Sequence, residues 1–158
     1  MKTARGVMRL MDKKVEPPQP LLRAPNGEPF PLGYRWLREH GLVGLRPWMF
    51  LDDADEAWRL RGEFVREVAS PNRCPIRDLL PFAQRKDRDE LAGFVVEGGK
   101  LTQEVALVHL SFKGRPERDR ELLLKRFTDI WEFAKEALLE DARDWANEEA
   151  LLRIQRQK

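Results

Sequence analysis

Cysteine, histidine and tyrosine are scarce in this chain of 158 residues, which has one cysteine, two histidines and one tyrosine. A single cysteine, Cys74, cannot form an internal disulfide, and this suits a reducing compartment. No apolar run approaches the length of a membrane span, and the N-terminus lacks the apolar core of a signal peptide. We therefore expect a cytoplasmic protein.

An excess of charge of one sign is also lacking. The chain has 29 lysines and arginines against 27 aspartates and glutamates, a net charge of +2 that is too small to argue for nucleic-acid binding. Its composition, 42% hydrophobic and 35% charged, is typical of a soluble globular protein. At this length one domain buries about 70% of its unfolded surface. The sequence therefore predicts a single folded domain.

Proline is concentrated near the N-terminus, where it breaks any helix because it lacks the N–H group. We expect residues 1–28 to be partly disordered, residues 29–147 to form the domain and residues 148–158 to be a C-terminal tail. The N-terminal segment is either a solvated tail or a docking arm. Its basic residues are Lys2, Arg5, Arg9, Lys13, Lys14 and Arg23.

Hydrophobic periodicity predicts two helices followed by three strands. The first helix covers residues 32–41, and the second covers residues 51–69 with Asp52 or Asp53 as its N-cap. Strands are expected over residues 77–83, 91–96 and 104–112, and short polar links join them as hairpins require.

A long helix is expected over residues 117–147. Its predicted core stripe is Leu123, Phe127, Ile130, Trp131, Ala134 and Leu138. The whole pattern predicts an α+β fold, a mainly antiparallel sheet packed against flanking helices, with the helices on one face.

A charged stretch, QRKDRDE, separates the first two predicted strands and brings Asp87, Asp89 and Glu90 together. An EF-hand calcium loop counted from Asp87 fails, because its sixth position is Ala92 and its twelfth is Gly98. The turn preferences of these residues favour a solvated hairpin tip. A metal site and a partner contact remain open alternatives.

Other motifs for chemistry are incomplete. The stretch GFVVEGG resembles a phosphate loop, but Gly99 stands where the lysine belongs, so it predicts a hairpin turn. Neither His40 nor His109 has a metal ligand at helical spacing, and we expect no metal and no cofactor. A pairing of Cys74 with His109 stays open, because catalytic groups assemble in space rather than in sequence.

Five tryptophans in a small domain suggest a binding surface. Trp48 follows Pro47 in a predicted loop and is the candidate for an exposed interface anchor. Beside it, the charged tip would supply a polar rim. The predicted partner-binding residues are Trp48, Asp87, Arg88, Asp89 and Glu90.

Taken in order, these segments resemble the SUKH superfamily, which includes bacterial immunity proteins and a yeast cell-wall regulator. The resemblance covers residues 32–145 and rests on YRWLREHGLVGLRPWMFL, DLLPFAQRKDRDELAGFVV, EVALVHLSF and RFTDIWEFAKEALLEDARDW. It implies a non-enzymatic protein that binds and neutralises a toxin of the nuclease or deaminase class. Together with the lack of a membrane span and of a one-sided basic surface, it leads us to expect no membrane, no specific nucleic acid and no small-molecule substrate.

Two further readings remain. One is an intracellular scaffold or regulator that has no toxin partner. The other is an enzyme whose site would be assembled from Asp87, Asp89, His109 and Cys74, for which a deep polar pocket joining these groups would be needed.

Overall fold

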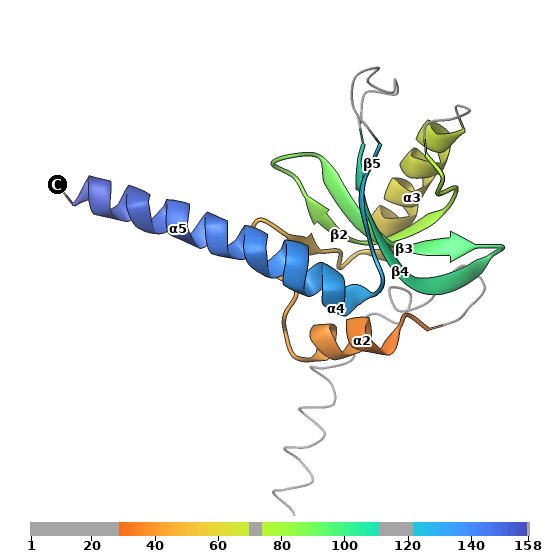
Figure 1. The fold of residues 1–158 in the computed structure, drawn as a ribbon, viewed down its shortest axis with the longest axis horizontal. Helices are drawn as coiled ribbons and strands as arrows, with labels where there is room; N and C mark the ends of the chain where they lie inside the picture. The colour runs from red at the N-terminus through yellow and green to blue at the C-terminus, as the bar shows by residue number, and fades with distance from the viewer. Residues whose placement is uncertain (1–28, 70–73, 111–121, 158) are drawn as a thin grey trace, which may run out of the picture.

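The computed structural model describes residues 29–69, 74–110 and 122–157. Their central element is a five-stranded sheet in the order β1-β2-β3-β4-β5, in which every neighbouring pair is antiparallel (Figure 1). The strands are β1 Met49–Phe50, β2 Leu79–Arg85, β3 Glu90–Glu97, β4 Lys100–His109 and β5 Leu123–Phe127. The order follows the chain, so the sheet is a meander.

Two hairpins build the centre of this sheet. Strands β3 and β4 are joined at Gly98 and Gly99, which have φ of 56° and 77° and so fit the tight turn that the sequence predicted. Strands β2 and β3 are joined by residues 86–89, and Asp89 has a φ of 53°. The charged stretch is therefore a hairpin tip, as predicted.

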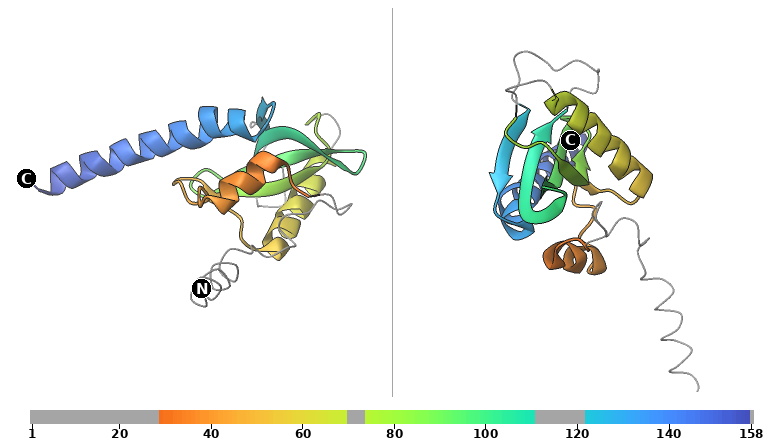
Figure 2. Two further views of the ribbon diagram at one scale, coloured as in Figure 1. Left: turned by 90° about the horizontal axis from the view of Figure 1, so that it is seen from below. Right: turned by 90° about the vertical axis from the view of Figure 1, so that its right-hand side faces the viewer.

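Helices cover both faces of the sheet, whereas the sequence analysis placed them on one face. Helix α3 (Ala54–Val68) packs Leu60 and Phe64 against one face. The right-hand view of Figure 2 shows α3 and the C-terminal helix on opposite sides of the strands. Strand β2 is buried along its whole length, since both of its faces are covered. The sequence of a strand that is covered on both faces is a continuous apolar run. Such a run does not indicate which helix lies on which face.

The second face carries an aromatic core. Helix α2 (Leu32–Glu39) and helix α4 (Ile130–Phe133) pack on it. Phe82 and Phe94 lie 4.8 Å apart between ring centroids, and Phe133 meets Phe82 edge to face at 5.6 Å. The core aromatic residues of this face are Phe30, Tyr34, Trp48, Phe50, Phe82, Phe94, Phe127 and Phe133.

The C-terminal helical segment leaves the domain and projects away from it (Figure 1). It consists of α4, a π-helical turn η2 (Ala134–Leu138) and α5 (Leu139–Arg156). Helix α5 has no buried residue. Among the helices of the described residues, none combines the length and the apolar character that crossing a bilayer requires.

The structure confirms the α+β class and the two early helices, with Asp53 as the N-cap of α3. The start of the last helix was wrong, because Leu123 and Phe127 lie in β5, where backbone pairing with β4 outweighs their helical spacing. Its predicted end at Asn147 is also too early, since α5 continues to Arg156. Residues 1–28 and 111–121 lie outside the described residues, and so do the predicted strand end at Phe112 and the predicted helix start at Glu117.

Strand β3 passes so close to β2 that only glycine fits at position 93. A Cβ on Gly93 would lie 2.7 Å from the Leu79 Cγ atom and 2.7 Å from the Leu80 carbonyl oxygen. We expect Gly93→Ala to lower the free energy of unfolding in urea by about 1–3 kcal/mol. The matched control is Gly62→Ala in α3, where a Cβ meets nothing within 4 Å. This variant should raise the free energy of unfolding by about 0.5–1 kcal/mol, because alanine favours the helix more than glycine does. Equal effects of the two variants would contradict this packing.

Candidate partner-binding pocket

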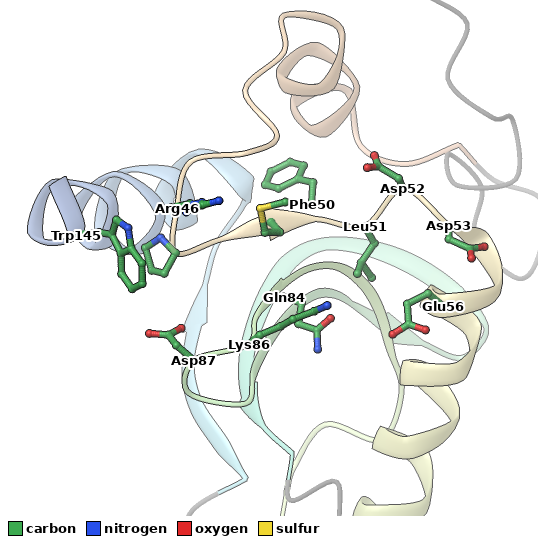
Figure 3. Close-up of a pocket in the computed structure, with 12 residues that line it drawn as sticks. Arg46, Phe50, Leu51, Asp52, Asp53, Glu56, Gln84, Lys86, Asp87 and Trp145 are labelled. Carbon is green, nitrogen blue, oxygen red and sulfur yellow. The ribbon is translucent and has the colours of Figure 1, made fainter. Parts of the chain in front are cut away.

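A pocket of about 690 Å³ lies beside β1, at one edge of the sheet. We call it the β1 pocket. Figure 3 shows Trp145 and Asp87 at one end of it and Asp53 and Glu56 at the other. It is lined by Arg46, Pro47, Met49, Phe50, Leu51, Asp52, Asp53, Glu56, Gln84, Lys86, Asp87 and Trp145.

Strand β1 supplies the apolar part of the pocket. Its two residues alternate, so that Phe50 is buried in the core whereas the Met49 side chain is 50% exposed. The strand is held on both sides, because the Phe50 amide donates to the Val43 carbonyl at 2.9 Å and the Leu51 amide donates to the Phe82 carbonyl at 2.9 Å. The exposed methionine therefore stands on a fixed backbone.

Carboxylates outnumber cations around this apolar surface. Asp52, Asp53, Glu56 and Asp87 line the pocket, against two basic residues, Arg46 and Lys86. The excess is local, since the whole chain has a net charge of +2.

Neighbouring groups hold these carboxylates in place. Asp52 is 82% exposed and pairs with Arg38 at 2.7 Å. Asp53 accepts a hydrogen bond from the Asp55 amide at the start of α3. Hydrogen bonding from Arg59 lowers the pKa of Glu56. The pocket thus has carboxylates at both ends of an apolar surface, and three of them are paired with arginines that do not line it.

A buried arginine fixes the end of the pocket nearest to α5. The Arg85 side chain is 7% exposed and binds two carboxylates. Its Nε donates to Asp87 Oδ1 at 2.9 Å, and its Nη1 lies 3.0 Å from Asp141 Oδ2. Burial opposes the charged form of Arg85, but the Asp87 bond and the charge of Asp141 outweigh it, so its pKa is raised. Hairpin β2–β3 and helix α5 are therefore tied together through one guanidinium.

Trp48 belongs to this network and not to the surface, so the expectation that it is exposed was wrong. Its side chain is fully buried and meets Phe133 edge to face at 5.3 Å. Its indole Nε1–H donates to Asp141 Oδ2 at 2.9 Å. The cause is this distant partner, since Asp141 lies 93 residues away and satisfies the polar end of the indole. Trp48 therefore acts as a core residue behind the pocket.

The four predicted tip residues have different surroundings. Asp87 lines the pocket and holds Arg85, as described. Arg88 and Asp89 are exposed. The Arg88 carbonyl oxygen lies 3.1 Å from His109 Nδ1, and the Asp89 carbonyl oxygen accepts a hydrogen bond from the Leu110 amide at 3.1 Å. Glu90 begins β3 and is partly buried. The structure therefore brings one of the four into the pocket.

Sequence reasoning missed most of the pocket. The sequence analysis placed Met49 in a loop and explained the acidic residues at the start of α3 by helix capping. Trp145 lies one turn after Asp141, and this i, i+4 spacing was a signal that both face the same side of α5. That signal could be used only once the buried partner of Asp141 was known.

The alternatives that involve catalysis or metal binding gain no support from the described geometry. Within residues 29–69, 74–110 and 122–157, no three His, Cys, Asp or Glu side chains come together in a way that could hold a metal ion. Cys74 is buried, and burial raises the pKa of its thiol, which disfavours the thiolate form. His109 lies at the end of β4, and its ring contacts the Arg88 carbonyl.

No protein-family model, curated protein sequence or solved structure matches this chain. The likeness to the SUKH superfamily and the function that it implies therefore remain predictions. Function has to be argued from the geometry of the described residues.

The Arg85 network predicts a large difference between two aspartates of the same helix. Asp141→Ala removes one of two carboxylates from a buried guanidinium and leaves the Trp48 indole without an acceptor. We expect the free energy of unfolding in urea to fall by about 2–3 kcal/mol. The control Asp144→Ala, whose side chain is 68% exposed, should change it by less than about 0.5 kcal/mol. Similar losses in both variants would contradict the network.

Glu90 predicts a pH-dependent effect. Burial raises its pKa, with Arg85 and Arg88 acting against this and Asp141 and Asp87 adding to it. The folded protein therefore holds this proton to higher pH than the unfolded chain, and the stability that Glu90 contributes falls as pH rises through that interval. We expect Glu90→Gln to raise the melting temperature at pH 7 and to have little effect below pH 4. Glu97→Gln, at the exposed end of β3, is the control. A gain of equal size at both pH values would show that the charge of Glu90 is not the cause.

Proposed function

We propose that this chain is a non-enzymatic protein-binding domain that acts in the cytoplasm as an immunity protein and neutralises a toxin by occupying its surface. The observation that carries the proposal is the β1 pocket, in which the half-exposed Met49 and four carboxylates line one opening. Protein interfaces have this anatomy, an apolar centre surrounded by polar groups that remain in contact with water. The resemblance to the SUKH superfamily points to the same class of function.

The charge of the pocket lining also indicates which class of partner the pocket fits. Four carboxylates against two cations favour a partner segment that is basic and carries an apolar side chain able to reach Met49. Toxins that act on nucleic acids carry basic surfaces, because they must attract phosphates. A nuclease or a deaminase therefore suits the pocket better than an acidic protein does.

The proposed mechanism is occlusion. The Arg85 network holds β1, the hairpin tip and the base of α5 in one arrangement before the partner arrives. A preformed surface loses little conformational entropy on binding, so more of the contact energy appears as affinity. No bond is made or broken in either protein.

One observation favours a second candidate, a scaffold that joins two proteins. Helix α5 carries apolar side chains that are more than half exposed, and its C-terminal end projects away from the domain (Figure 1). These residues are Leu139, Leu151, Leu152 and Ile154. Simultaneous capture of two different proteins, one lost on changing Met49 and one lost on changing Leu152, would favour the scaffold.

Met49→Lys tests the proposal, because it places a cation in the apolar lining of the pocket without disturbing a buried group. A tagged chain should capture a basic protein that is toxic when expressed alone and harmless when co-expressed with the wild-type chain. We expect Met49→Lys to weaken that complex by at least roughly tenfold, which is the loss of one interface anchor. Toxicity should return in parallel.

Leu124→Lys is the matched control. Leu124 is 44% exposed, close to the 50% of Met49, but it lies on β5 at the other edge of the sheet. This variant should bind and protect like the wild type. Loss of binding in Leu124→Lys with full binding in Met49→Lys would move the interface away from the β1 pocket. Capture of an acidic partner would contradict the charge argument.

A further inference from the structure

A second hollow lies at the surface where α2 meets α4, and the function proposed above does not use it. Its volume is about 250 Å³, and Pro31, Trp36, Gln103 and Trp131 are among the residues that line it. The side chains of Trp36 and Trp131 are 45% and 49% exposed. Their ring centroids lie 5.9 Å apart with the planes inclined at 58°. Two large aromatic groups thus remain in contact with water, side by side.

Both indoles are supported from behind. His40 stacks on the Trp36 ring at 3.8 Å with the planes inclined at 19°, and its Nδ1 lies 2.8 Å from the Trp36 carbonyl oxygen. Trp131 lies against Gly33, where a Cβ would be 2.9 Å from its Nε1 and 2.6 Å from the Ile130 Cγ2 atom. Only glycine permits this approach between α2 and α4. The hollow is therefore a built feature of the packing and not the chance exposure of two side chains.

The chemistry of the hollow fits a proline-rich peptide. Grooves that recognise such peptides are lined by aromatic side chains, against which proline rings pack, and a polyproline II helix loses little entropy on binding because it is already extended. Gln103 adds an amide that can bond the unpaired carbonyls of such a helix. Asp129 adds one carboxylate at the same hollow.

The chain itself contains a ligand of this kind. Residues 16–20 read Glu-Pro-Pro-Gln-Pro, and Pro17 and Pro20 are three residues apart, which places them on one side of a helix with three residues per turn. Two lysines, Lys13 and Lys14, precede them and complement the carboxylate of Asp129. The sequence thus supplies both the proline spacing and the charge that the hollow fits.

The tether is long enough. The described residues resume at position 29, and Pro31 already lines the hollow. Eight residues lie between Pro20 and Pro29, and the nine steps that join the two prolines can span about 28 Å at 3.1 Å per step. A short tether gives an effective concentration on the order of 1 mM, so a dissociation constant of about 0.1 mM would leave about nine-tenths of the chains docked.

We propose that the hollow between Trp36 and Trp131 is a binding site for a proline-rich segment and that its ligand is residues 16–20 of the same chain. This site is independent of the β1 pocket. It gives the basic N-terminal segment a docking place on the domain, and it covers aromatic surface that is otherwise exposed. Release of the segment would uncover the two tryptophans.

The first experiment compares the five indole N–H signals of the full chain by NMR, each assigned with a Trp→Phe variant. The triple variant P17A/P18A/P20A removes the ligand without changing the described domain. We expect the signals of Trp36 and Trp131 to move and those of Trp48, Trp58 and Trp145 to stay. Unchanged positions for Trp36 and Trp131 would overturn the proposal.

The second experiment places a spin label at Gln19→Cys in a Cys74→Ala background. We expect the label to broaden Trp36 and Trp131 much more strongly than Trp58, which is 38% exposed on α3 and serves as the internal control. Trp131→Ala should abolish the extra broadening at Trp36. Equal broadening of all exposed indoles would overturn the proposal.

Dilution identifies the source of the ligand. Docking within one chain does not depend on concentration, so the broadening should be unchanged after tenfold dilution. Broadening that disappears on dilution would assign the segment to a second copy and would overturn docking in the same chain. A second result would also overturn docking in the same chain. In that result P17A/P18A/P20A has no effect, yet the signals of Trp36 and Trp131 respond to an added proline-rich peptide of another sequence.

Discussion

The guanidinium of Arg85 lies almost entirely out of solvent and binds two carboxylates from different parts of the chain. Asp87 comes from the same hairpin, and Asp141 comes from α5 and also accepts the Trp48 indole hydrogen. A buried charge that loses its partners costs several kcal/mol, so these elements are held together as a set. The direction in which α5 leaves the domain and the position of Trp145 at the edge of the β1 pocket both follow from this contact.

The two edges of the sheet differ in a way that explains where the pocket lies. Strand β1 has two residues and pairs only with Gln84 and Ala83 of β2, so most of that edge is left to loops and to the start of α3. At the other edge, Arg126 on β5 pairs with Glu104 and Lys125 pairs with Glu136. Charged side chains of this kind protect an edge strand from association. The β1 pocket therefore lies at the edge that has fewer strand-borne charges.

The sequence predicted those features that depend on neighbours along the chain. Helix α3 and its cap at Asp53 follow from periodicity and capping, and both hairpin turns follow from turn chemistry. Leu123 and Phe127 were misassigned because their spacing fits a helix. They lie in a strand because their backbone pairs with β4. Trp48 was misplaced for a related reason, since its partner Asp141 lies 93 residues away. Of the predicted site, Asp87 alone lines the pocket, because the rest of the pocket is assembled by contacts between distant segments.

The central claim is that a protein partner docks on the β1 pocket and that the Arg85 network holds that surface ready. Hydrogen exchange, measured on the chain alone and on its complex with the captured toxin, tests this most directly. The account predicts that binding slows exchange in residues 46–56 and 84–89 and leaves residues 123–127 unchanged. Slowed exchange that is confined to β5 or to the distal part of α5, with residues 46–56 unaffected, would contradict it.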